Sequence, residues 1–488
     1  DLFDKNLHKA LMFLPLMGIF IFTVLPLLFM IPMAFTNYSV KGDHLVLFDW
    51  TGFASFGQVL GLGGKLGKIF WRVLGWTICW AVFATFLCNF LGLLLAIVIN
   101  RKETHCKAFW RTCFVISIAV PQFVSLLVMR QMFQPQGAVN NLLLEWGWID
   151  NPLPFWTNTM WARVSVILIN CWVGIPYTML QVTGVLQNVP SELYEAAKID
   201  GANAAQIFFK ITLPYIMFIM GPYIITQFTG NINNFNVIYL LSAGKPTPVG
   251  DSAGKTDLLV TWLYKLTIDN QEYNIGAVIG ILTFVVLSIV ALVTYRNTKS
   301  YKETGVAKAK RPMSAGRAKK VAKNSLVHII LGILAVVWLF PIFWIIMTSF
   351  RAESGAYTKY FFPHGLTFSN YTRLFTETTL LNFPRAFFNT LFISVFSCII
   401  STVFVLSVAY CMSRLRFKMR KPFMNLAMIL GLFPAFMSMV AVYFILKAIG
   451  LTEGSMLRIS LILIYSAGAG TGFYIAKGFF DTVPKSLT

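Results

Sequence analysis

The amino-acid sequence predicts an all-α protein, a polytopic bundle of transmembrane helices. Of its 488 residues, 57% are hydrophobic and only 12% are charged, whereas soluble domains carry about 25% charged residues. The apolar residues also form runs of about 20 residues or more, the length that a helix needs to cross a hydrocarbon core of about 30 Å. This composition argues strongly against a soluble enzyme.

Ten such runs follow one another along the chain, and we expect about ten spans. They lie at residues 11–35, 73–100, 112–132, 164–187, 215–241, 275–295, 326–350, 386–412, 423–446 and 459–476. The five His and seven Cys residues have no ligand spacing, and most of the Cys residues lie inside apolar runs. We therefore expect no metal site and no disulfide framework.

The distribution of charge predicts the topology. Lys and Arg outnumber Asp and Glu by 40 to 19, and the cations gather at residues 101–111, 296–323 and 414–421. The positive-inside rule places these segments and the amino terminus in the cytoplasm. The loops at residues 37–69, 133–163, 242–274 and 351–385 then face outward. Since basic cytoplasmic segments lie beside anionic lipid, we expect the bilayer and not nucleic acid as their partner.

The chain contains an internal repeat. The matched positions, at shifts of 313 and then 294 residues, include Arg72 with Arg385, Arg101 with Arg414, Pro121 with Pro434, Gly174 with Gly468, and Gly184 with Gly478. We expect two homologous halves with the same membrane orientation. Residues 1–296 form one half with six spans, and residues 326–488 form the other. The basic segment 297–325 between them is either a cytoplasmic linker or the junction of two joined chains.

A cytoplasmic loop at residues 189–214 separates the fourth and fifth spans. Ser191 is suited to cap a short helix, and Asp200-Gly201 is a helix-stop signal. A second helix is expected to lead to Pro214. A short helix with small residues at Ala196 and Ala197 is suited to docking in a groove of another protein, although an ordinary interfacial helix is the alternative.

The spacing within this loop resembles the EAA motif of binding-protein-dependent ABC importer permeases. The matching residues are Glu195, Ala196, Ala197, Gly201, Ile211, Leu213 and Pro214. The resemblance implies a type I ABC importer permease fold in which these residues couple the spans to two cytoplasmic MalK-like ATPase subunits. ATP and Mg would then bind the ATPases, and this chain would bind no cofactor and have no catalytic residues. Because the chain stops at Thr488, one position before the matching Glu of the second half, we expect that half to be truncated.

The fourth and fifth spans carry unusual polar residues. The fifth contains Gly230-Asn-Ile-Asn-Asn-Phe-Asn236, and amides are costly in lipid unless they face a cavity or a partner helix. With Trp172-Val-Gly-Ile-Pro-Tyr177 of the fourth span, this segment resembles MalF-type subunits of maltose and oligosaccharide importers. The resemblance implies sugar contacts at Gly174, Tyr177, Asn231 and Asn234, and a cavity lining of Asn170, Val173, Gln227, Gly230 and Asn236. Residues 326–488 resemble the MalG-type partner, which would pair with the first half.

The sequence places no Asp, Glu, Lys or Arg in the central part of any span. Amides and aromatic rings suit a neutral polyol, because hydroxyls need both donors and acceptors. We therefore expect a bacterial cytoplasmic-membrane permease that imports maltose, malto-oligosaccharide or a related neutral sugar delivered by an external binding protein. An ABC permease for another neutral solute is one alternative. An ion-coupled secondary transporter is another, but it predicts acidic or His relays within the spans.

Overall fold

The computed structural model describes residues 2–39, 49–101, 103–187, 189, 191–297, 318–353, 355, 361–379, 381–415, 417–434 and 437–482. The described residues are mainly helical, with isolated β-bridges between Thr36 and Trp50 and between Arg351 and Leu366. They form two compact units, each of which draws on both expected halves. The terminal unit comprises Asp1–Phe70, Trp262–Ser288 and Tyr371–Thr488, and the central unit comprises Trp71–Thr261 and Ile289–Asn370.

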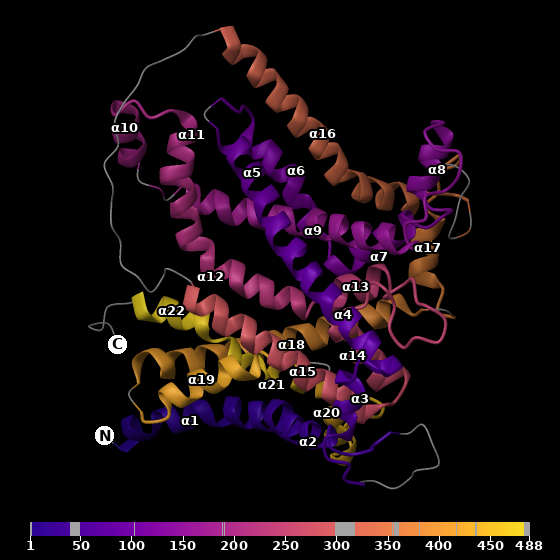
Figure 1. The fold of residues 1–488 in the computed structure, drawn as a ribbon, viewed down its shortest axis with the longest axis vertical. Coiled ribbons are helices and arrows are strands. Elements are labelled where there is room, and N and C mark those ends of the chain that lie inside the picture. The colour runs from indigo at the N-terminus through magenta and orange to yellow at the C-terminus, as the bar shows by residue number, and fades with distance from the viewer. Residues whose placement is uncertain are drawn as a thin grey trace. The chain divides into compact units, whose positions relative to one another are not determined.

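Long apolar helices confirm the predicted fold class (Figure 1). Among the described residues, seven helical stretches are long and apolar enough to cross a membrane, or eight if one bent pair counts as a span. The seven are Asn6–Met33, Lys65–Asn100, Thr159–Gln187, Ala204–Gly221, Tyr273–Val293, Ser325–Ser349 and Phe383–Arg414. This number is lower than the ten expected, because three of the expected spans are divided into helices that are each too short to cross a membrane alone.

Two of the broken spans contain the proline pair of the repeat. Residues 112–132 form α6 (Lys107–Ala119) and α7 (Gln122–Met132), which are bent by 90° at a break that contains Pro121. Residues 423–446 form α19 (Arg420–Leu430) and α20 (Met439–Ala448), with Pro434 between them. Proline removes a helical hydrogen bond and its ring clashes with the preceding turn.

The third broken span is rich in glycine, which has a low helix propensity. Residues 459–476 form α21 (Met456–Ala467), a 3₁₀ turn over Ala469–Gly472 and α22 (Tyr474–Thr482). Residues 483–488, which the repeat aligns with the start of the loop at 189–214, lie outside the described residues.

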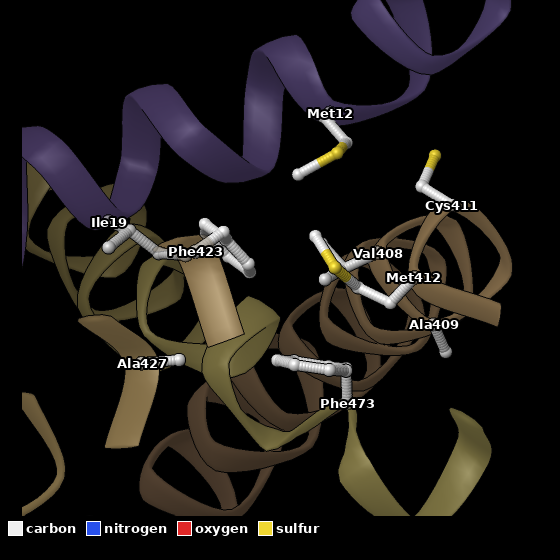
Figure 2. Packing of buried hydrophobic residues seen from close by; sticks show 9 residues of the cluster. All are labelled: Met12, Ile19, Val408, Ala409, Cys411, Met412, Phe423, Ala427 and Phe473. Carbon is white, nitrogen blue, oxygen red and sulfur yellow. The ribbon is translucent and has the colours of Figure 1, made fainter. Parts of the chain in front are cut away.

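In the terminal unit, the first helix of the chain packs on helices of the second half. Helix α1 (Leu2–Ile19) continues through a π turn (Phe20–Val24) into α2 (Leu25–Met33), and α18 spans Phe383–Arg414. Figure 2 shows the buried cluster that α1 and α18 form with α19 and Phe473, which comprises Met12, Ile19, Val408, Ala409, Cys411, Met412, Phe423, Ala427 and Phe473. Within lipid, such close packing contributes van der Waals attraction, because the hydrophobic effect no longer drives association.

In the central unit, the relationship is reversed, because α16 (Ala318–Ser349) of the second half packs on helices of the first. Trp338 Nε1 donates a 3.0 Å hydrogen bond to the backbone oxygen of Trp172, and the Trp338 ring meets Phe114 edge-on at 5.4 Å between centroids. Helix α16 begins inside the expected linker at 297–325, so that residues 318–325 are helical. Residues 298–317 lie outside the described part of the chain.

The other helices complete the two units. The central unit includes α4 (Lys65–Val82) from Trp71 onward, a π turn (Phe83–Leu87), α5 (Cys88–Asn100), α8 (Ala138–Glu145) and α9 (Thr159–Gln187). The remaining elements are α3 (Ala54–Leu60), α14 (Leu259–Tyr264), a π turn (Lys265–Asp269), α15 (Tyr273–Asn297) and α17 (Ser369–Thr376).

Candidate functional site

The fifth expected span breaks where its amides are concentrated. Helix α12 (Leu213–Ile232) ends before Asn233, and α13 (Phe235–Leu241) begins after Asn234. The side chain of Asn234 accepts a 3.3 Å hydrogen bond from the backbone N–H of Val237, which makes it the N-cap of α13. Since Asn is a preferred N-cap residue, this sequence itself favours the start of a new helix.

Asn231 joins the break to the second expected span. Its side chain is only 7% exposed, and its Nδ2 donates to Thr85 Oγ1 over 2.9 Å. Its backbone oxygen accepts a 3.1 Å hydrogen bond from Trp80 Nε1, and its Oδ1 accepts one of 3.4 Å from Asn234. Asn231 therefore fixes the position of the break against the π turn and α4.

A second amide pair lies beside this contact. Asn89 Nδ2, on α5, donates to Gln227 Oε1, on α12, over 2.5 Å and to the backbone oxygen of Thr85 over 2.8 Å. Asn89 Oδ1 is buried and has no hydrogen-bond partner among the described residues. A buried acceptor without a partner carries a desolvation cost of about 1–3 kcal/mol. Asn89 therefore adds an unsatisfied acceptor to this amide pair.

The polar residues of the fourth span lie close to Cys88 of α5. Asn170 is buried, and its Nδ2 lies 3.7 Å from Cys88 Sγ. Cys171 Sγ lies 3.4 Å from the same sulfur. A Cβ added at Gly174 would approach Cys88 Sγ to 3.2 Å, which is tighter than most such contacts. Gly174 therefore permits the close approach of α5 and α9.

The other expected sugar-site residues differ in exposure. Tyr177, on α9, is 45% exposed, and Gly230 and Asn236 are also exposed, while Val173 is half-buried. The structure thus brings Asn231, Asn234 and Gln227 together through Thr85 and Asn89, and it brings Asn170 and Gly174 together at Cys88. Whether any of the nine residues contacts sugar stays a prediction.

The loop between the fourth and fifth spans contains the expected short helix. Helix α10 (Ser191–Ile199) is followed by a turn in which Gly201 has a φ of +74°. The backbone N–H of Gly201 donates to Lys198 O over 3.0 Å, and that of Ala202 donates to Ala197 O over 2.8 Å. These two hydrogen bonds define a Schellman cap, for which glycine is the favoured residue.

The second helix of the loop starts with a capping box. Asn203 Oδ1 accepts from the Gln206 backbone N–H over 2.8 Å, and Gln206 Oε1 accepts from the Asn203 N–H over 2.9 Å. Helix α11 (Ala204–Ile207) then continues through a π turn (Phe208–Thr212) into α12. Tyr194 Oη lies 3.3 Å from Thr212 Oγ1 and so links α10 to this continuous helix.

The expected coupling residues divide into exposed and buried positions. Glu195, Ala196 and Pro214 are exposed, Gly201, Ile211 and Leu213 are half-buried, and Ala197 is buried. The apolar side chains of Leu193 and Ile199 are also exposed on α10, at 40% and 63%. Helix α10 therefore exposes small, acidic and apolar side chains around much of its circumference.

Several residues of the site were not expected from the sequence. Trp80, Thr85, Cys88 and Asn89 lie inside an apolar run and have no motif of their own. The one sequence signal was the amide of Asn89, an isolated polar group in a long apolar segment, which calls for a partner in lipid. The capping box also had a visible signal, because Asn203 and Gln206 have the spacing of that motif.

Comparison with known proteins gives the family. Residues 88–299 match the family described as binding-protein-dependent transport system inner membrane component. The galactooligosaccharides transport system permease protein GanP of Bacillus subtilis (strain 168) is 43% identical over 292 residues, which are 59% of this chain and 69% of GanP. The maltodextrin transport system permease protein MdxF of the same organism is 38% identical over 294 residues, 58% of this chain and 66% of MdxF.

More distant similarities agree. The maltose/maltodextrin transport system permease protein MalF of Klebsiella aerogenes is 32% identical over 274 residues, but the match spans only 51% of its length and 54% of this chain. A crystal structure of a bacterial ABC transporter involved in the import of the acidic polysaccharide alginate has the same fold, with a TM-score of 0.50 and 22% identity over 62% of this chain and 98% of that one. On the sequence similarity to GanP and the family match, this chain belongs to the binding-protein-dependent transport system inner membrane components, a family of multi-pass permease subunits.

Proposed function

We propose that the chain is the transmembrane permease of an ABC importer for a neutral sugar, such as maltose, a malto-oligosaccharide or a related oligosaccharide. The spans would move the sugar inward by alternating access. ATP would be hydrolysed, with Mg, on two separate MalK-like subunits, and an external binding protein would deliver the sugar. The amino terminus would lie in the cytoplasm.

The accessible surface of α10 is the observation that carries this proposal. A helix that only covered the membrane interface would need to place its apolar side chains toward lipid. Here the small residue Ala196 is exposed one turn from Leu193, and the acid Glu195 is exposed on the opposite side of the helix. Tyr194 lies 3.3 Å from Thr212. A force applied to α10 would pass through this contact and the Schellman cap into α12, which carries Gln227 and Asn231.

The polar cluster on α12, α13 and α5 supports a neutral substrate. Its linked side chains are Asn89, Gln227, Asn231 and Asn234, together with the hydroxyl of Thr85, and all of these groups are uncharged. Amides supply both donors and acceptors, which sugar hydroxyls require. The relatives GanP and MdxF, named as galactooligosaccharide and maltodextrin permeases, support the oligosaccharide class.

The partner proteins are proposed on two grounds. The alginate ABC transporter was also solved with an alginate pentasaccharide-bound periplasmic protein, which supports an external binding protein here. Its chain is 21% identical to this one and establishes the fold alone. The ATPase subunits are proposed from the EAA-type loop and its exposed helix α10.

Charge reversal at Glu195 tests the coupling role. In membranes that contain the chain with its ATPases and binding protein, we expect Glu195→Lys to lower sugar uptake about tenfold or more, because a mismatched charge at an interface costs more than ~1.4 kcal/mol. Gly201→Asp should have the same effect, since it places a Cβ in the left-handed turn that ends α10. Sugar uptake and ATP hydrolysis are measured side by side.

Glu145→Lys provides the matched control, because it reverses an exposed carboxylate at the end of α8, in a loop expected to face outward. Normal, ATPase-dependent uptake in both Glu195→Lys and Gly201→Asp would contradict the coupling role. Uptake that persists without the ATPases but collapses with the ion gradient would identify a secondary transporter instead.

The native cysteines test the orientation. Cys106 is exposed at the start of α6, in the cationic segment at 101–111. We expect a membrane-impermeant maleimide to label Cys106 in inside-out vesicles and not in intact cells, with Cys106→Ser as the control that removes the signal. Labelling of Cys106 in intact cells would reverse the proposed topology.

A further inference from the structure

Helices α7 and α16 are in contact in the central unit. An open cavity of about 540 Å³ lies on the surface between them. It is lined by Leu127, Val128, Arg130, Gln131, Gln134 and Trp344. Its volume is within the range of about 300–1,000 Å³ that is usual for small-molecule sites. None of these residues belongs to the proposed sugar or coupling sites, so the cavity needs a separate explanation.

The charge of the cavity points to an anion. Of the described residues that line it, Arg130 is the one charged side chain, and the others are two amides, two aliphatic residues and an indole. A guanidinium presents several N–H donors in a planar fork that matches the oxygens of a phosphate. The amide groups of Gln131, at the end of α7, and of Gln134, in the turn that follows it, add donors.

An apolar stripe runs from the cavity along α7. Phe123 and Leu127 are exposed and lie one helical turn apart, which places them on the same face, and Leu127 lines the cavity. A free phosphate or a sugar would gain little from such a stripe, whereas an acyl chain would pack along it.

The loop that follows α7 has the residues of an interface between membrane and water. The backbone oxygen of Arg130 accepts a 3.2 Å hydrogen bond from Trp156 Nε1 of the following loop. In that loop Trp146 and Trp148 are 55% and 70% exposed and pack on each other at 4.9 Å between centroids. Exposed tryptophans of this kind are enriched at the level of the lipid headgroups.

The walls of the cavity are held in place. Helix α16 is fixed by the hydrogen bond from Trp338 to Trp172 and by the edge-on contact of Trp338 with Phe114. Helix α7 is fixed by the contact between Arg130 and Trp156. The cavity is therefore preformed, and its ligand would lose less free energy in ordering the site.

From these observations we propose that the cavity binds the headgroup of an anionic phospholipid. Its phosphate lies against Arg130 with the glutamine amides around it, and one acyl chain follows Leu127 and Phe123. The binding chemistry is independent of the transported solute and of the ATPases. In the proposed topology, the lipid belongs to the outer leaflet.

The test uses the purified full-length chain, with bound lipid counted by native mass spectrometry. Phosphatidylglycerol and phosphatidylcholine with identical acyl chains are the probes. We expect phosphatidylglycerol to bind more tightly, and Arg130→Gln to weaken it about fivefold, the usual contribution of one basic residue at an anionic membrane surface. Arg130→Lys should recover part of the binding.

Lys447→Gln is the matched control, since Lys447 is an exposed cation at the end of α20, directly after the expected ninth span, and the cavity does not include it. Val128→Phe fills the cavity without changing charge and should also weaken phosphatidylglycerol. Equal binding by the wild type, Arg130→Gln and Val128→Phe would overturn the proposal. Displacement of the lipid by millimolar inorganic phosphate would identify a free-anion site and would overturn it equally. Because these readouts involve no transport, failure here leaves the proposed sugar import standing.

Discussion

Two polar clamps occupy corresponding places in the two halves of the sequence but differ in chemistry. In the central unit, Asn100 Nδ2 at the end of α5 donates to Thr183 Oγ1 near the end of α9 over 2.9 Å. In the terminal unit, Ser413 Oγ near the end of α18 donates to Asp481 Oδ1 near the end of α22 over 2.5 Å. We call the first pair the neutral clamp and the second, with Lys477, the ionic clamp.

The internal repeat relates the two clamps. The shift that aligns Arg101 with Arg414 places Asn100 on Ser413, and the second shift places Thr183 on Lys477. The neutral clamp ties α9 to α5 just before α10 begins. The ionic clamp ties α22 to α18 just before residues 483–488, which the repeat aligns with the start of the same loop. Each clamp therefore restrains a helix that leads into an expected coupling segment.

The difference between the clamps lies in how they respond to solution conditions. In the neutral clamp the acceptor oxygen of Asn100 receives a 2.6 Å hydrogen bond from Arg111. The amide of Asn100 and the hydroxyl of Thr183 are both uncharged. In the ionic clamp, Lys477 Nζ donates to Asp481 Oδ2 over 2.6 Å. The Asp481 carboxylate is 44% exposed, so salt screens this pair.

The largest expected effect is at the neutral clamp. Asn100→Leu removes the acceptor of Arg111 and the donor to Thr183, and it leaves a charged donor without its partner in a half-buried place. We expect the free energy of unfolding to fall by about 2–3 kcal/mol, measured by denaturation of the full chain in detergent. Sugar uptake should fall with it, because α9 would no longer be held against α5.

Asn100→Asp separates the two hydrogen bonds of the neutral clamp. It keeps an acceptor for Arg111 but removes the amide donor to Thr183, so its effect should be smaller than that of Asn100→Leu. If Asn100→Leu were as stable as the wild type, the clamp would not contribute to the fold, and the comparison between the two halves would lose its basis.

A smaller effect is expected at the ionic clamp. Asp481→Asn keeps an acceptor for Ser413 but removes the charge that Lys477 meets, and pairs of this i,i+4 type contribute about 0.5 kcal/mol when exposed. Unfolding is measured at low and at high salt. The wild type should lose most of its advantage over Asp481→Asn at high salt, whereas a salt-independent difference would argue against the ionic nature of the clamp.

Most of the fold was accessible from the sequence, because long apolar runs have few stable alternatives in a membrane. The break at Asn233 and Asn234 and the cap at Gly201 were also predictable, since they depend on local residue chemistry. The reduced number of unbroken spans was not, although Pro121 and Pro434 marked two of the breaks. Hydropathy reports the length of an apolar segment and does not register a bend within it.

The sequence did not predict which residues of different helices contact one another. Nothing local indicates that Asn89 meets Gln227, or that Met12 packs near Val408, because the rotation and register of each helix depend on all of its neighbours. The same holds for Gly174, where the sequence suggested a substrate contact and the structure places the sulfur of Cys88 close to the glycine. A small residue in a span is therefore explained first by the close approach of two helices, and only then by contact with a ligand.

The smallest expected effect is a pH dependence confined to the ionic clamp. The hydrogen bond from Lys477, and next that from Ser413, lowers the pKa of Asp481 below its ordinary value of 3.8. A lowered folded-state pKa means that the clamp stabilises the protein fully above that ordinary value and loses its contribution as the pH falls through the lowered pKa. The difference in stability between the wild type and Asp481→Asn should therefore stay constant from pH 7 to about pH 5 and shrink at lower pH.

The effect of Asn100→Leu should not change over the same range, because Asn100 and Thr183 do not titrate. If the Asp481→Asn difference instead grew on acidification, the folded-state pKa of Asp481 would have to be raised, and the two clamps would no longer differ in the way their contacts require.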